Sequence, residues 1–178
     1  MKKIGILLSS PKDIGGIFQY SLSIINSLKN FKKKKIYKIQ YFYTDKIWEE
    51  YIPKNSKKIF IKKKLNKKFL RKIINFSFDD SLKFYKKNEF LNEEVVSINK
   101  SDCDLVIYPS QNIVSYLTNK KSLSTIHDLM HKYESHFDEY DVNTIKNRDL
   151  HYQSICNKCD GILVDSKLGQ NHVLDSYK

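Results

Sequence analysis

Two short apolar runs in the second half of the chain each stop at a polar turn, and a long helical segment separates them. The first run ends in Ile126-His127-Asp128, and the second, Gly161-Ile162-Leu163-Val164, ends in Asp165-Ser166. Short apolar runs are typical of buried parallel strands. Because an α/β sheet forms its ligand cleft where the strands end, the pattern predicts an α/β fold with any site at these turns.

The same alternation of strand and helix begins at the amino terminus. An apolar run at residues 3–8 predicts a buried strand that ends in a turn at 9–13, and apolar residues at helical spacing predict a helix from Gly16 onward. Further strands are expected at 37–43, 58–61, 104–109, 123–127 and 161–164. A long helix is expected at 142–159, with one apolar face that comprises Val142, Ile145, Tyr152, Ile155, Cys156 and Cys159. We therefore expect a Rossmann-like three-layer α/β/α fold with a mostly parallel sheet.

The 178 residues fit one domain, and we expect a single Rossmann-like domain over residues 1–178. The stretch from 62 to 100 is the least regular. Its apolar residues predict a basic amphipathic helix at 65–74 and a second helix at 82–90. A final helix is expected after Ser166, and the sequence ends where another domain could begin.

The net charge of +12 is carried by the first half of the chain. Residues 1–100 hold 24 Lys and Arg against 9 Asp and Glu, whereas residues 101–178 hold 8 against 11. Only Arg71 and Arg148 are arginines, and lysine suits diffuse attraction better than bidentate recognition. Nucleic acid is therefore not an expected partner. One explanation is composition bias, in which case the lysines simply cover a solvent-exposed face of the protein. The alternative is that they attract an anionic membrane surface.

Cysteine usage and hydropathy indicate the compartment. The three cysteines, Cys103, Cys156 and Cys159, form an odd set, and the first apolar run is too short for a secretory signal. No run approaches 18 apolar residues, so no transmembrane helix is expected. We expect a cytoplasmic protein, with peripheral attachment to the inner face of the membrane as a further expectation. The Cys156 and Cys159 pair is expected to pack in the core.

Two short motifs could carry chemistry. Gly15-Gly16 at a helix start would let backbone amides approach an anion, although two glycines can also serve a purely conformational role. His127 follows a strand, where an imidazole can exchange a proton with a bound hydroxyl or can simply hold the loop. His127 and His131 have the spacing of a metal pair on a helix, but no further ligands complete a site, so no metal is expected.

Together these motifs resemble the N-terminal half of family 4 glycosyltransferases, which have the GT-B fold. The resemblance rests on the strand before Gly15-Gly16, on His127-Asp128-Leu129-x-His131, and on the segment Cys159-Asp160-Gly161-Ile162-Leu163-Val164-Asp165-Ser166 with its following helix. It implies transfer of a hexose from a nucleotide-diphosphate sugar to a glycan or lipid-linked acceptor, as in polysaccharide biosynthesis. Retention of configuration is implied, and no cofactor is.

The resemblance also implies roles for single residues. His127 would be the catalytic residue near the reaction centre, Gly15 and Gly16 would contact the donor diphosphate, and Asp128 and Ser166 would shape the cleft wall and bind substrate. The C-terminal nucleotide-binding domain of the family has no counterpart in this sequence. We therefore expect an acceptor-binding domain that is inactive alone, either a fragment or a subunit whose partner is a separate donor-binding subunit. The alternative is a non-catalytic Rossmann-like module that acts through a protein partner.

Overall fold

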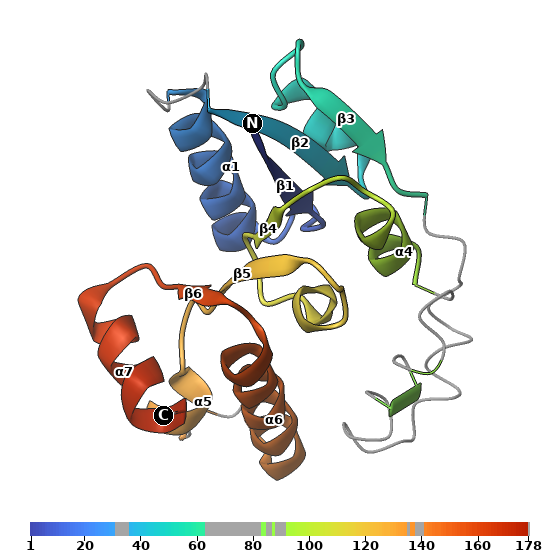
Figure 1. The fold of residues 1–178 in the computed structure, drawn as a ribbon. Helices are drawn as coiled ribbons and strands as arrows, with labels where there is room; N and C mark the ends of the chain where they lie inside the picture. Colours follow the sequence, from blue (N-terminus) through green and yellow to red (C-terminus); the bar gives the residue numbers. More distant parts are fainter. Residues whose placement is uncertain are drawn as a thin grey trace.

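The structure is a computed structural model, and it describes residues 1–30, 36–62, 83–84, 87, 92–134, 136–137 and 141–177. Six parallel strands form one sheet in the order β3-β2-β1-β4-β5-β6 (Figure 1). The strands are β1 Lys2–Leu8, β2 Tyr37–Tyr43, β3 Lys57–Phe60, β4 Leu105–Tyr108, β5 Lys121–Thr125 and β6 Gly161–Leu163. This is the strand order of dinucleotide-binding Rossmann folds, so the predicted fold class is confirmed.

Helices cover both faces of the sheet. The α-helices are α1 Gly15–Lys29, α4 Glu93–Asn99, α5 Met130–Tyr133, α6 Val142–Lys158 and α7 Lys167–Tyr177, and the short 3-10 helices are η1 Lys46–Glu50 and η3 Ile113–Tyr116. One apolar cluster joins α1 and η1 to the sheet, and a second joins α4, η3 and α6 to it. Figure 1 shows α5, α6 and α7 grouped on the β6 side.

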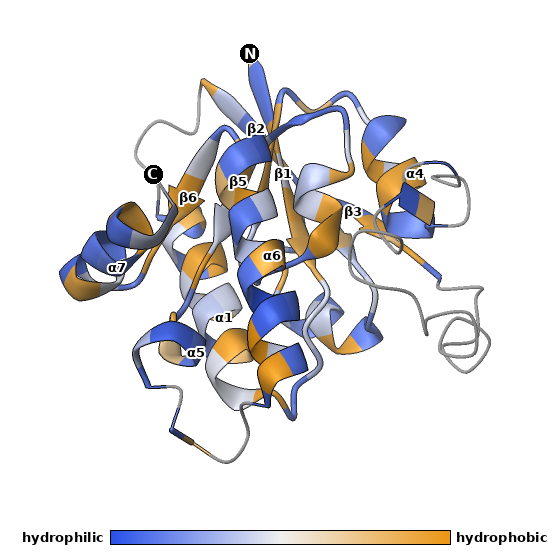
Figure 2. Cartoon of the chain, turned by 90° about the horizontal axis from the view of Figure 1, so that it is seen from below, coloured by the Kyte–Doolittle hydropathy of each residue, from blue (hydrophilic) through white to orange (hydrophobic). Residues whose placement is uncertain are grey.

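The two clusters arise from the alternation of side chains along each strand. In β1, Ile6 and Leu8 pack toward α1 with Phe18 and Trp48, whereas Leu7 lies in the cluster of the other face. The apolar runs are therefore buried on both faces, as expected for a covered parallel sheet. Figure 2 shows apolar residues along β1 and β6, whereas α6 and α7 carry both hydrophilic and apolar residues.

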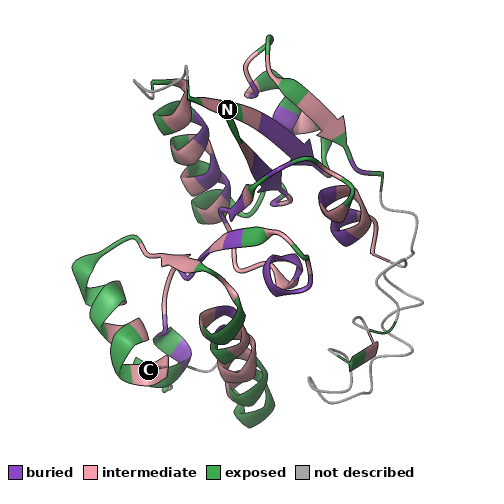
Figure 3. Ribbon diagram, in the orientation of Figure 1, coloured by how far each residue is buried: buried purple, intermediate pink, exposed green. Residues whose placement is uncertain are grey.

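Most expected elements are present, with differences at their ends. β5 ends at Thr125, two residues earlier than expected, although the N–H of Ile126 still donates to the carbonyl of Leu163 in β6 over 2.9 Å. The expected inward position of Val142 is wrong: its side chain is 81% exposed, because the first turn of α6 extends beyond the sheet (Figure 3). The helices expected at 65–74 and 82–90 lie outside the described residues, apart from 83, 84 and 87.

The order of strands places a topological switch point between β1 and β4. From β1 the chain passes through α1 on one face to β2, and from β4 it passes through η3 on the other face to β5. The two connections diverge at the carboxyl ends of β1 and β4, which is where open α/β sheets place their ligand sites. In the described part of the chain, no helix is both long enough and apolar enough to cross a bilayer.

Candidate functional site

Two loops meet at the switch point, and hydrogen bonds fix both of them. Asn112, in the loop after β4, donates from Nδ2 to Oγ of Ser9 after β1 over 2.9 Å. The indole N–H of Trp48 donates to the carbonyl of Ser10 over 3.1 Å, and Trp48 is fully buried. The loop that leads into α1 is therefore held from both sides, and it presents the first turn of α1 to solvent.

Gly15 and Gly16 form that first turn, although neither the backbone conformation nor the packing requires glycine at these positions. No described glycine has a positive φ, and a Cβ at either position would meet nothing within 4 Å. The helix has no side-chain cap at Ile14 and no acidic residue in its first turn. The exposed amides at the positive end of the helix dipole are thus available to an anion.

We expect Gly16→Ala to stabilise the protein by about 0.4–1 kcal/mol. Gly16 is exposed in helical backbone with open space at the Cβ position, so alanine restricts only the unfolded chain. Urea denaturation followed by circular dichroism measures the change. A loss of stability would contradict the conclusion that the fold does not need this glycine.

The imidazole of His127 lies just beyond the carboxyl end of β5, in a fixed orientation. Its Nε2 lies 3.0 Å from the carbonyl oxygen of Pro109, which can only accept, so Nε2 carries the proton. The ring of Tyr20 from α1 contacts it edge-on, with 4.8 Å between centroids and 90° between planes. In the neutral ring Nδ1 is then an acceptor, and it can receive a hydrogen bond or a proton from a bound hydroxyl.

Asp128 has a different role from its neighbour in this structure. Its carboxylate accepts from the backbone N–H of Met130 over 3.1 Å and pairs with Nη2 of Arg148 at 3.2 Å. Arg148 in turn donates from Nε to the hydroxyl of Tyr152, which also accepts from Gln111. Asp128 thereby ties the loop after β5 to α6 and to the loop after β4, and its contact with a substrate stays a prediction.

His127 and His131 do not form the metal pair that their spacing could give. His131 is 1% exposed, and its Nε2 faces the hydroxyl of Tyr177 at 3.4 Å, whereas His127 faces Pro109. Within the residues that the structure describes, no three His, Cys, Asp or Glu side chains come together as metal ligands would.

His131 and His151 make stability depend on pH. Burial is the main cause that lowers the pKa of both, and the charge of Arg148 lowers it further. The unfolded chain therefore binds protons at a higher pH than the folded chain. The contribution of the two neutral histidines to folding stability is complete above the histidine pKa of the unfolded chain, near 6.5, and is lost as the pH falls below that value. We expect the free energy of unfolding to decrease between pH 7.5 and about pH 5.5.

Urea unfolding at a series of pH values measures this slope. His151→Gln removes one of the two titrating groups and should therefore flatten the slope. The variant can also lower overall stability, because Nδ1 of His151 accepts a hydrogen bond from the hydroxyl of Tyr116 over 2.7 Å. His136, whose side chain is 72% exposed, provides the matched histidine control. An unchanged slope in His151→Gln would refute the assignment.

Ser166 lies at the carboxyl end of β6, where it caps α7. Its Oγ accepts from the backbone N–H of Gly169 over 2.9 Å. This is the hydrogen bond of a helix N-cap, so a local structural role accounts for the hydroxyl. A contact of Ser166 with substrate remains a prediction.

Cys156 and Cys159 pack against the apolar cluster on the α6 face, as expected. Burial raises the pKa of the Cys156 thiol to about 11, and Sγ of Cys159 lies 3.5 Å from Oγ of Ser115. The Cys156 thiol therefore stays protonated and is a poor nucleophile. The two cysteines of the CxxC motif therefore have a packing role.

The structure thus places Gly15, Gly16, His127, Asp128 and Ser166 along one edge of the sheet, and Tyr20 joins α1 to His127 there. Sequence reasoning missed the polar residues that join the loops: Ser9, Gln111, Asn112 and Arg148. Gln111 and Asn112 closely follow Pro109, which stops a predicted strand, and that position was a usable signal.

No protein-family model matches the chain, and no curated protein matches it. Among solved structures, it is similar to the UDP-GlcNAc 2-epimerase from Methanocaldococcus jannaschii, with 17% sequence identity and a TM-score of 0.48. The alignment covers 97% of this chain and 42% of that one, so the chain spans less than half the length of that enzyme.

Proposed function

We propose that this chain is the acceptor-binding half of a glycosyltransferase that uses a nucleotide-diphosphate sugar. The observation that carries the proposal is the arrangement at the switch point. His127, whose tautomer is fixed by Pro109, lies against Tyr20 of α1, and α1 begins with two exposed glycines that its backbone does not require. Nδ1 of His127, which can accept a hydrogen bond, and the first turn of α1, which suits an anion, thus lie at the same edge of the sheet.

Each group would have a distinct task. The donor diphosphate would lie against the amides of Gly15 and Gly16, where the helix dipole favours negative charge. Nδ1 of His127 would accept a hydrogen bond from a sugar hydroxyl and so orient the sugar or the acceptor. Asp128 would act through Arg148 as a positioning residue. The tasks of Gly15, Gly16 and His127 are those that the resemblance to family 4 glycosyltransferases implies, whereas the task of Asp128 differs from the substrate contact implied there.

A leaving diphosphate needs stabilising donors from both sides of a cleft. The opposite wall would be a donor-binding domain, supplied by a further segment or by a separate subunit. The acceptor would be a glycan or a lipid-linked sugar, and the lysine-rich first half of the chain would attract an anionic membrane surface beside it. The reaction as proposed needs no metal.

Titration of the ¹⁵N-labelled protein with uridine diphosphate and with nucleotide sugars tests the proposal. We expect the backbone amide signals of Gly15, Gly16 and His127 to shift together with increasing ligand. Gly161, at the amino end of β6 and so at the opposite edge of the sheet, serves as the internal control. Shifts confined to other parts of the chain, or none at millimolar ligand, would refute the proposed donor contact.

A further inference from the structure

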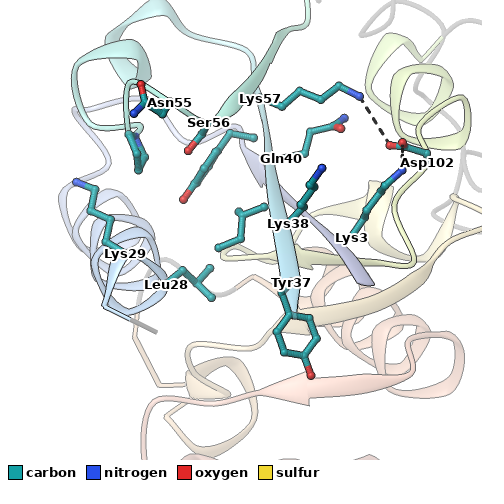
Figure 4. A pocket seen from close by; sticks show the side chains of 13 residues that line it. Lys3, Leu28, Lys29, Tyr37, Lys38, Gln40, Asn55, Ser56, Lys57 and Asp102 are labelled. Atoms are coloured by element: carbon teal, nitrogen blue, oxygen red, sulfur yellow. Dashed lines mark hydrogen bonds and ion pairs between the residues drawn. The ribbon is translucent and has the colours of Figure 1, made fainter. Parts of the chain in front are cut away.

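A cavity of about 690 Å³ opens at the edge of the sheet opposite to His127. It lies at the amino ends of β1, β2 and β3, and the end of α1 and the loop at residues 53–56 complete it (Figure 4). We call it the amino-edge cavity. Its volume is within the range of small-molecule sites, which is roughly 300–1,000 Å³.

The amino-edge cavity extends to both faces of the sheet beside the part of β2 that does not pair with β3. The pairing of β2 with β3 begins at Gln40 opposite Lys57, so residues 37–39 have no partner from β3. In Figure 4, Lys38 and Gln40 lie on one side of β2, and Leu28 and Ser56 lie on the other. The cavity therefore has two sides of different chemistry.

One side is positively charged. Lys3, Lys38 and Lys57 line it together with Asp102, which pairs with Lys3 and lies 3.7 Å from Nζ of Lys57. The hydrogen bond with Asp102 raises the pKa of Lys3 and so supports its positive charge. Lys38 has no ion-pair partner among the residues that the structure describes. Three ammonium groups thus face one carboxylate, and the excess favours an anion.

Gln40 gives independent evidence for a ligand on that side. It is only 4% exposed, it lines the cavity, and its buried Nε2 donates to no group of the described residues. A buried donor without a partner is unfavourable, because it has lost its hydrogen bonds to water. Figure 4 shows Gln40 between Lys38 and Lys57, where an oxyanion could accept from all three side chains.

The other side is mainly apolar. Leu28, Ile39, Tyr41 and Pro53 line it, and Lys29 at the end of α1 adds one further positive charge. Tyr41 is 1% exposed, and burial raises its pKa to about 12, so the phenol stays neutral at physiological pH. This side suits a ring or an aliphatic group rather than a second charge.

We propose that the amino-edge cavity binds a small organic phosphate. The phosphate lies beside Lys38, Lys57 and Gln40, and the apolar part of the ligand packs against Leu28, Ile39 and Pro53. The site is separate from the edge that holds His127, so it would be a second ligand site of the chain.

Calorimetric titration with phenyl phosphate and with adenosine 5′-monophosphate tests the proposal. We expect both to bind more tightly than phenol, adenosine or inorganic phosphate, because only they engage both sides of the cavity. Lys38→Ala should weaken binding about tenfold or more, as expected for a lost charge-assisted hydrogen bond. Added salt should weaken binding further by screening.

Gln40→Met provides a second variant with two opposite readouts. Replacing an unpaired buried amide with an apolar chain of similar shape should raise the melting temperature of the free protein, yet it should weaken phosphate binding. Lys146→Ala removes an exposed lysine of α6 and is the matched control, for which we expect native affinity.

Three results would overturn the proposal. One is the absence of binding of both phosphates at millimolar concentration. Another is binding of adenosine as tight as that of its monophosphate. The third is native affinity in both Lys38→Ala and Gln40→Met, which would place the phosphate at another site, such as the start of α1.

Discussion

Replacing Trp48 with alanine is expected to lower the free energy of unfolding by about 3–5 kcal/mol. Trp48 is fully buried in the cluster between α1 and the sheet, and its ring lies 4.4 Å from that of Phe18. Truncation would leave a large cavity and would also remove the hydrogen bond to the carbonyl of Ser10. Urea denaturation followed by circular dichroism measures the loss.

Trp48→Phe separates the two contributions. Phenylalanine keeps much of the apolar contact but leaves the Ser10 carbonyl without the indole donor, so we expect a smaller loss that includes about 1 kcal/mol for the hydrogen bond. Phe60→Ala, at a side chain that is 41% exposed, controls for aromatic loss near the surface. A Trp48→Ala variant about as stable as the Phe60 control would show that this cluster does not hold the fold.

The second large effect concerns His127 and applies to the proposed transferase, once it is completed by a donor-binding half. We expect His127→Ala to reduce the rate of transfer by about 10²-fold or more, the scale at which acid–base and polar active-site groups act. The loss arises because Nδ1 is the acceptor that would orient a hydroxyl at the reaction centre. Release of nucleoside diphosphate from the sugar donor measures kcat and KM.

A glutamine at this position tests the function of Nδ1 itself. In His127→Gln the amide nitrogen can still donate to the Pro109 carbonyl, as Nε2 does, but no acceptor remains where Nδ1 was. We expect near-native stability with the same loss of kcat. His136→Ala is the matched control, since its side chain is 72% exposed. Native kcat in both His127 variants would instead favour a non-catalytic binding module.

The sequence predicted the sheet well because buried parallel strands have a strong local signal. The apolar runs that became β1, β4 and β6 are short, continuous and ended by turn residues. The position of Val142 was predicted wrongly because helical spacing shows which residues share a face but not how far the sheet extends beneath it. The end of β5 was placed two residues too late for a related reason: Ile126 is buried and still bonds to β6, but the pairing of β5 with β4 has already ended at Ser124.

The site was predictable only in part, because its geometry depends on contacts between distant segments. His127 and the two glycines were found from strand-end and helix-start signals. The hydrogen bonds that orient them, such as Asn112 to Ser9 across 103 residues, have no local signature. Asp128 shows the same limit, since it lies in the loop after β5 and its partner Arg148 lies on α6. The amino-edge cavity depends on where β3 begins to pair with β2, and no sequence pattern fixes that register.

The central place of β1 has a consequence during synthesis. β1 can pair with β2 early, but its other neighbour is β4, and Lys3 bonds to Asp104 across 101 residues of chain. At translation rates of about 5–20 residues per second, the edge of β1 that pairs with β4 would therefore stay unpaired for on the order of 5–20 s. An unpaired strand edge of this kind invites wrong association, so the nascent chain should depend on chaperones until β4 leaves the ribosome.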